Sequence, residues 1–163
     1  VALAAVLTTQ ATPLMNNNIE RMKDLYAVTA TSNTVNTQEM IFIEALPRYL
    51  PEDAVVWTDS WHGEGLIYAF TGINVTGRHM GSYGSDPSSI YVRDHLNEID
   101  TNPEVCEALR DVGTPYVVRF EGHNVNSAGV QRPGLTHLQK TKGLTVVYRR
   151  GNAFLYRVDG CGF

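Results

Sequence analysis

Residues 54–72 indicate an apolar strand, a polar turn and a helix in direct succession, and this run constrains the fold more than any other part of the chain. The strand at 54–58 is an almost unbroken apolar run, which is typical of a strand covered on both faces. The turn contains Gly63 and Gly65, and a helical pattern follows at 66–72. Ligands of open α/β sheets bind at the carboxyl ends of the strands, so this turn is where we expect a functional site.

Further strand and helix patterns extend this unit into one sheet. The strand patterns lie at 54–59, 73–76, 115–120 and, as two consecutive runs, at 144–158. The helical patterns lie at about 38–49, 90–99 and 103–112. We therefore predict an α/β fold, a Rossmann-like three-layer sandwich, in which helices cover both faces of a mainly parallel sheet that ends in an antiparallel hairpin.

Capping residues support two of these helices. Asn36 or Thr37 precedes the first pattern, and Asn102 precedes the last one. The last helix also has Pro103 at its favoured first position and Gly113 just beyond its end. Both helices are therefore expected to begin at these residues.

Six side chains from the turn at 59–64 and from a long polar loop at 77–89 are candidate ligand-binding residues. They are Asp59, Trp61, His62, Arg78, His79 and Tyr83. We expect both segments at one edge of the sheet, and polar loops of this length within a compact domain are more often functional. Aromatic faces mixed with hydrogen-bonding groups suit a sugar or another polar ligand.

No complete catalytic set accompanies these residues. His62-Gly63-Glu64 has the H-x-E form of zinc deaminases, but the P-C-x-x-C pair that those sites require is missing. We therefore predict no catalytic residue, no metal and no cofactor for this domain. Two alternatives stay open. One is a small hydrolase or metal-dependent enzyme that uses residues 59–86, with His62, Glu64 and His79 around a metal, and the other is a structural cap without a ligand.

Length and charge limit the organisation and the partners of the chain. Its 163 residues suit one α/β domain at 38–163, preceded by an N-terminal segment at 1–37 that contains a short helix. The net charge is −4 and the basic residues are scattered. Proteins that bind nucleic acids usually present a clustered basic face, so we expect no nucleic-acid partner.

The apolar stretch at 1–7 permits two interpretations. It is far shorter than the ~20 residues that cross a bilayer. It fits the end of a transmembrane helix, but an ordinary edge strand or the first turn of a buried helix fits it somewhat better.

The two cysteines also leave two possibilities open. Cys106 lies in a predicted helix and Cys161 lies close to the end of the chain. An even number of cysteines permits one disulfide, but two buried free thiols are equally compatible with this spacing.

Five short motifs suggest a family. They are Leu46-Pro47, Pro51-x-x-Ala54-Val55-Val56, Trp61-x-Gly63-x-x-Leu66-x-Tyr68-Ala69-x-Thr71-Gly72, Pro103-x-Val105-Cys106-x-Ala108-Leu109 and Gly113-x-x-Tyr116-Val117-Val118. Across about residues 40–159 the chain resembles the carboxyl-terminal domain of an uncharacterised family of actinobacterial multi-spanning membrane proteins. The long amino-terminal part of that family resembles glycosyltransferases of the GT-C type. The motifs are mostly structural and bring no catalytic residue into this chain.

The resemblance implies an extracytoplasmic domain at the cell membrane. Residues 1–7 would then be the remnant of the last transmembrane helix, and a disulfide between Cys106 and Cys161 would be expected. The implied function is accessory: the domain would bind envelope glycan, a lipid-linked sugar or the transmembrane region of its own chain.

Overall fold

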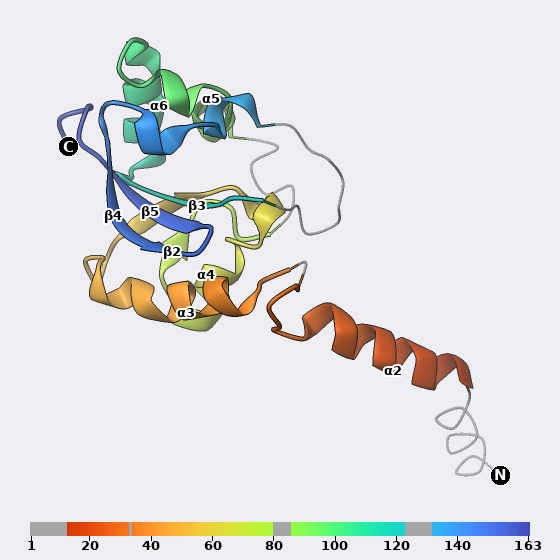
Figure 1. Ribbon diagram of the computed structural model, residues 1–163. Coiled ribbons are helices and arrows are strands. Elements are labelled where there is room, and N and C mark those ends of the chain that lie inside the picture. Colours follow the sequence, from red (N-terminus) through yellow and green to blue (C-terminus); the bar gives the residue numbers. More distant parts are fainter. Residues whose placement is uncertain (1–12, 33, 80–85, 123–131) are drawn as a thin grey trace.

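A computed structural model describes residues 13–32, 34–79, 86–122 and 132–163 (Figure 1). The helices are α2 (Pro13–Tyr26), α3 (Thr37–Ala45), α4 (Leu66–Thr71), α5 (Pro87–His95) and α6 (Pro103–Val112). The strands are β1 (Val55–Thr58), β2 (Asn74–Val75), β3 (Tyr116–Phe120), β4 (Leu144–Arg150) and β5 (Ala153–Val158). Short 3-10 helices are η1 (Leu46–Arg48), η2 (Ser60–His62), η3 (Leu96–Glu98), η4 (Pro133–Leu135) and η5 (Leu138–Lys140). Every predicted strand is present close to its predicted bounds.

The strands form one open five-stranded sheet in the order β2-β1-β3-β5-β4. β1 pairs in parallel with both β2 and β3, whereas β5 pairs antiparallel with both β3 and β4. The predicted α/β class and the terminal hairpin are confirmed. The sheet is parallel at one end and antiparallel at the other, rather than mainly parallel, because β5 pairs directly with β3. A hairpin needs only a short turn, whereas parallel neighbours need a long crossover connection.

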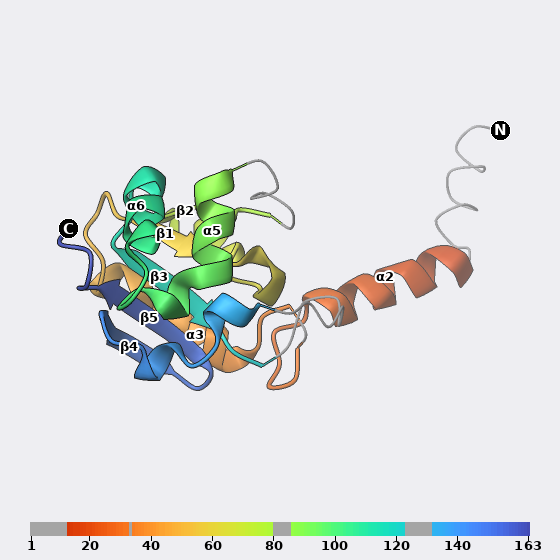
Figure 2. The ribbon, with the colours of Figure 1, turned by 90° about the horizontal axis from the view of Figure 1, so that it is seen from above.

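Two hydrophobic clusters lie on opposite faces of the sheet. Successive strand residues point to opposite faces, so Val56 belongs to one cluster and Trp57 to the other. The first cluster packs β1, β3 and β5 against α3 and α4, and the second packs the same strands against α5 and α6. Figures 1 and 2 show these two pairs of helices on the two faces of the sheet.

The expected helix caps are present. Asn36 caps α3, and the Glu39 side chain accepts a hydrogen bond from the Asn36 backbone N–H in return. Asn102 caps α6, which ends at Gly113 with a left-handed φ of 77°. Asp86 caps α5 by accepting from two backbone N–H groups. The polar loop predicted to reach residue 89 therefore ends at Asp86, because this side chain starts a helix there.

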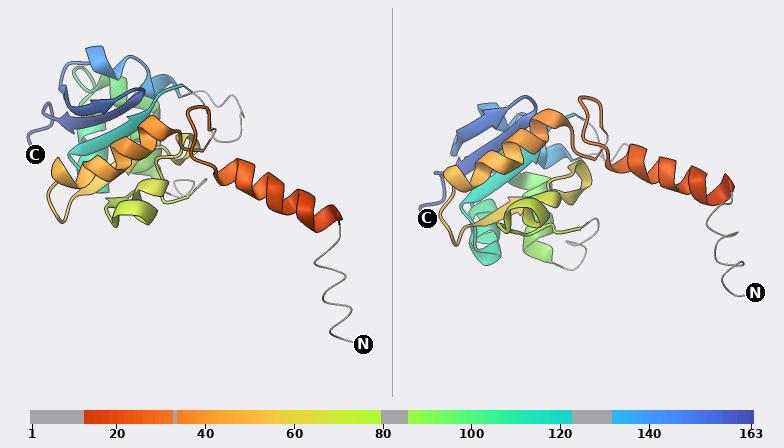
Figure 3. Two further views of the ribbon diagram at one scale, coloured as in Figure 1. Left: turned by 60° about the horizontal axis from the view of Figure 1, so that its bottom comes forward. Right: turned by 90° about the horizontal axis from the view of Figure 1, so that it is seen from below.

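α2 projects away from the sheet and its helices (Figures 1 and 3). Its Ile19 and Met22 side chains are exposed. Among the described residues, no helix is both long and apolar enough to cross a membrane. The apolar stretch at 1–7 lies outside the described residues, so its two interpretations stay predictions.

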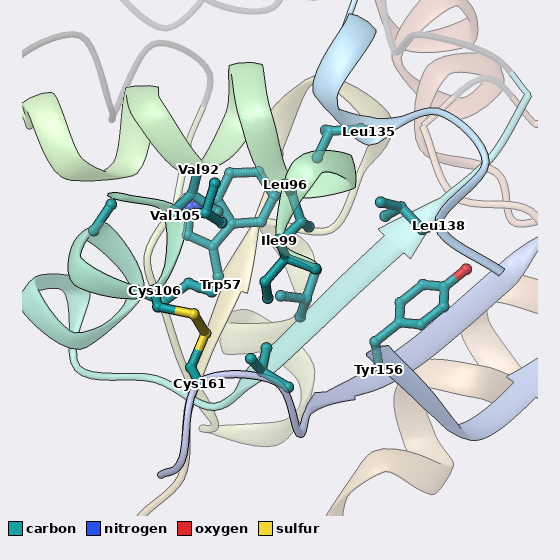
Figure 4. Close-up of a cluster of buried hydrophobic side chains, with 14 of the residues drawn as sticks. Trp57, Val92, Leu96, Ile99, Val105, Cys106, Leu135, Leu138, Tyr156 and Cys161 are labelled. Atoms are coloured by element: carbon teal, nitrogen blue, oxygen red, sulfur yellow. A yellow bond between two sulfur atoms is a disulfide. The ribbon is translucent and has the colours of Figure 1, made fainter. Parts of the chain in front are cut away.

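Cys106 and Cys161 form a disulfide that ties α6 to the end of the chain. Both residues are buried in the cluster on the α5 and α6 face, beside Val105 and Ile99 (Figure 4). The Arg110 side chain adds a second tie, because it donates a 2.8 Å hydrogen bond to the Cys161 carbonyl. The disulfide implied by the family resemblance is therefore present, and it holds the segment after β5 against α6.

Replacing both cysteines by alanine is expected to lower the free energy of unfolding by about 4 kcal/mol, because the bridge closes a loop with a sequence separation of 55 residues. Urea unfolding measures the change. Reductant should destabilise the wild type by a similar amount and leave the double variant unchanged. A double variant as stable as the oxidised wild type would contradict the prediction.

Candidate functional site

The turn after β1 is shaped by Asp59 and Gly63. The Asp59 side chain accepts a 3.2 Å hydrogen bond from the Trp61 backbone N–H and so caps η2. Gly63 follows η2 with φ 93°, and a Cβ atom at this position would lie 2.1 Å from the Thr34 carbonyl oxygen. The turn therefore folds back at the end of β1 with the segment after α2 packed directly on it.

Asp59 forms a buried ion pair with Arg132. Arg132 Nε donates to Asp59 Oδ2 at 2.8 Å, and the two side chains are 10% and 0% exposed. Arg132 is the residue just before η4. The pair therefore connects the end of β1 to the segment that follows β3 and precedes the terminal hairpin.

Arg119 of β3 contacts His62 of η2. Its two terminal nitrogens lie 2.7 Å from His62 Nδ1 and 3.3 Å from His62 Nε2, and both side chains are buried. A guanidinium has no acceptor atom, so His62 Nδ1 is the acceptor at the shorter distance and the imidazole is neutral in this arrangement. His62 Nδ1 also lies 3.7 Å from Asp59 Oδ2.

Glu64 completes the group and is fully buried. Its carboxyl accepts hydrogen bonds from the backbone N–H of Phe120 at 2.8 Å and of His62 at 3.2 Å, and Arg119 lies 3.6 Å from it. Burial is the main cause that raises the pKa of Glu64 to about 8; the Arg119 charge opposes the shift and the nearby Asp59 adds to it. The protonated carboxyl is therefore favoured at neutral pH.

These five residues constitute what we call the buried charge cluster. Its members are Asp59, His62, Glu64, Arg119 and Arg132. They come from the carboxyl ends of β1 and β3 and from the segments that follow them. Burying ionisable groups costs several kcal/mol for each ion, so this edge of the sheet is electrostatically costly.

The candidate residues predicted from the sequence are only partly brought together. Asp59 and His62 lie in the buried charge cluster, and Trp61 beside them is half-buried. The Arg78 side chain turns elsewhere: its guanidinium lies 4.6 Å from the centre of the Tyr68 ring and donates to the Asn74 side chain. His79 is exposed and Tyr83 lies outside the described residues.

A metal arrangement of His62, Glu64 and His79 is not found. Within the ranges that the structure describes, no three His, Cys, Asp or Glu side chains are placed to hold a metal ion. His62 and Glu64 instead contact Arg119.

Arg119 and Arg132 are site residues that are absent from the candidates predicted from the sequence, and Glu64 is present there only in the enzyme alternative. Arg119 carried a detectable signal, because it is a charged residue inside the apolar strand run at 115–120. Arg132 carried none, since it stands in a polar segment.

Gly63→Ala is expected to destabilise the domain more than Gly72→Ala. Both glycines have a left-handed φ, which costs about 1–2 kcal/mol for alanine, but a Cβ at Gly72 would meet no atom within 4 Å. At Gly63 the clash with Thr34 adds about 1–3 kcal/mol. Urea unfolding of the two variants compares these costs, and equal losses would contradict the packing described for this turn.

Glu64 is expected to make stability depend on pH. Its pKa is about 8 in the folded state, against an ordinary value of 4.5 for a glutamate exposed to solvent. The folded state therefore binds more protons between these values, and the free energy of unfolding falls as the pH rises through this window, by on the order of a few kcal/mol. Chemical unfolding at pH 5, 6.5 and 8 measures the slope.

Glu64→Gln should remove that slope, whereas replacing the exposed Glu52 by Gln should leave it intact. A Glu64→Gln variant with the wild-type slope would show that another group titrates.

Comparison with known proteins places the chain in a family. No curated protein matches it. The sequence profile of one family matches residues 1–160, which is almost the whole chain. The chain therefore belongs to the family of unknown function DUF6541.

Proposed function

We propose that this chain is an extracytoplasmic accessory domain of a membrane protein, and that it binds a sugar-containing ligand at the carboxyl ends of β1 and β3. The ligand would be envelope glycan or a lipid-linked sugar. The isolated domain would hold its ligand without converting it.

The observation that carries this proposal is the buried charge cluster. An apolar core would stabilise the same edge at lower cost, because a buried ion pair is often no better than well-packed apolar side chains. Clusters of ionisable residues with shifted pKa values are characteristic of functional sites. Asp59, His62 and Glu64 together with two arginines therefore favour a binding role for this edge over a purely structural one.

The position of the cluster in the sheet gives a second argument. β1 is followed along the chain by β2 on one side, and β3 lies on its other side. Where the connections that follow two neighbouring parallel strands run to opposite sides, a crevice opens at the carboxyl ends of these strands. α/β proteins bind ligands in this crevice. Helices on both faces of the sheet support the finer assignment, a Rossmann-like three-layer sandwich.

Two observations support a location outside the cytoplasm and close to a membrane. Disulfides such as Cys106–Cys161 persist mainly in oxidising compartments. α2 leaves the domain on the side where β3 ends (Figures 1 and 2). A ligand bound at this edge would lie on the same side of the domain as α2.

A sugar-binding edge also needs an apolar face, and Trp61 is the candidate. It is half-buried next to the cluster, and its backbone is held by the Asp59 carboxylate. A partly exposed aromatic ring at this position offers a stacking surface for a sugar.

The test is a titration of the isotope-labelled domain with galactose, mannose and arabinose mono- and disaccharides, followed by NMR. Amide signals of residues 59–65 and 119–121 are expected to shift. Trp61→Ala should raise Kd at least about five-fold through the lost stacking contact. The matched control is Tyr68→Ala, an exposed aromatic residue that contacts Arg78, which should leave Kd unchanged. Shifts confined to other parts of the domain, or no binding by any sugar, would leave the structural cap as the better interpretation.

A further inference from the structure

Unpaired polar atoms occur in the elements that carry the buried charge cluster and in the neighbouring strand β5. Among the described residues, three buried side-chain atoms have no hydrogen-bond partner: Ser60 Oγ, Arg119 Nε and Tyr156 Oη. Ser60 belongs to the same 3-10 helix as His62, whose ring contacts Arg119. Tyr156 pairs with Val117, two residues before Arg119, and its hydroxyl points toward the carboxyl end of β3 (Figure 4).

All three atoms can donate a hydrogen bond. The Arg119 Nε–H is only a donor, and the two hydroxyls can donate or accept. Leaving a buried donor without an acceptor costs about 1–3 kcal/mol, and native proteins rarely tolerate such groups without a reason. A hydrogen-bond acceptor at this edge of the sheet would therefore satisfy all three of these atoms.

The charges lead to the same conclusion. Arg132 pairs with Asp59 at 2.8 Å, whereas the carboxyl that approaches Arg119 within the described residues is Glu64 at 3.6 Å. The closest contact of Arg119 is the ring of His62, which carries no negative charge. A buried cation without a full counter-charge is costly, and an anion would balance it.

The geometry points to an anionic oxygen group, a phosphate or a carboxylate, as the part of the ligand that this edge binds, with Arg119 and Ser60 as its principal donors. This inference rests on the function proposed above and specifies its ligand as a charged sugar, such as a sugar phosphate or a uronic acid. Both groups present several acceptor oxygens, and arginine binds them with paired donors. The Arg119 side chain keeps 10% of its surface exposed, so the cluster is not sealed from solvent.

Calorimetric titration of the whole chain with four probes tests the inference. The probes are galactose, galactose 1-phosphate, galacturonate and inorganic phosphate. We expect the two charged sugars to bind at least ten-fold more tightly than galactose. Competition by inorganic phosphate or by galacturonate then distinguishes a phosphate from a carboxylate as the preferred group.

Three variants identify the donors. Arg119→Lys keeps the charge but loses Nε, and it should weaken binding of the charged sugars at least ten-fold. Ser60→Ala should weaken their binding several-fold while leaving the unfolding midpoint unchanged or raised, because an unpaired hydroxyl is removed. This second variant keeps the test decisive if Arg119→Lys fails to fold. The exposed Arg48 supplies the matched control, Arg48→Lys, which should bind like the wild type.

The outcomes separate the two proposals. Two results would overturn the anion site while the sugar-binding function stands. One is equal affinity for galactose and galactose 1-phosphate. The other is binding of the charged sugars that is weakened neither by Arg119→Lys nor by Ser60→Ala. Binding of inorganic phosphate that depends on Arg119, with no binding of any sugar, would support the anion site and contradict the proposed function.

Discussion

The Glu64 carboxyl joins the two strands on which the rest of the structure depends. It accepts one hydrogen bond from the Phe120 backbone at the end of β3 and another from the His62 backbone in the turn after β1. These bonds hold the turn against the neighbouring strand beyond the last paired residues, Thr58 and Val118. The backbone of His62, whose ring contacts Arg119, is held in part by this single buried group.

The cluster around Glu64 differs from the hydrophobic core beneath it. Trp57 and Val117 lie on the same sheet face as Arg119 but toward the middle of the strands, where they pack against α5 and α6. Two residues further along each strand, at Asp59 and Arg119, the sheet carries charge instead of hydrocarbon. The hydrophobic clusters on the two faces do not include this charged layer, which is why we propose that it binds a ligand.

The disulfide and the capped helices keep this edge in place from a distance. Cys106–Cys161 ties the end of the chain to α6, and α6 packs on the face that carries Arg119. At the other side, the segment after α2 lies directly on Gly63, where only glycine leaves room for the Thr34 carbonyl. The edge is therefore framed by elements that are distant in sequence, and its side chains have few alternative arrangements.

The sequence by itself determined the local elements. An apolar run predicts β1, and Asn102, Pro103 and Gly113 predict both ends of α6, because backbone capping depends on neighbouring residues. Only the tertiary structure decided that β5 lies next to β3, since strand pairing joins residues far apart in the chain. It also decided the site. Asp59 and Arg132 are 73 residues apart in sequence and Arg119 and His62 are 57 apart, and no local pattern encodes contacts over such separations. Arg78 lies in the segment where we expected a binding residue, but its guanidinium lies over the Tyr68 ring. A cation–π contact, which position in the chain does not reveal, therefore sets where this side chain lies.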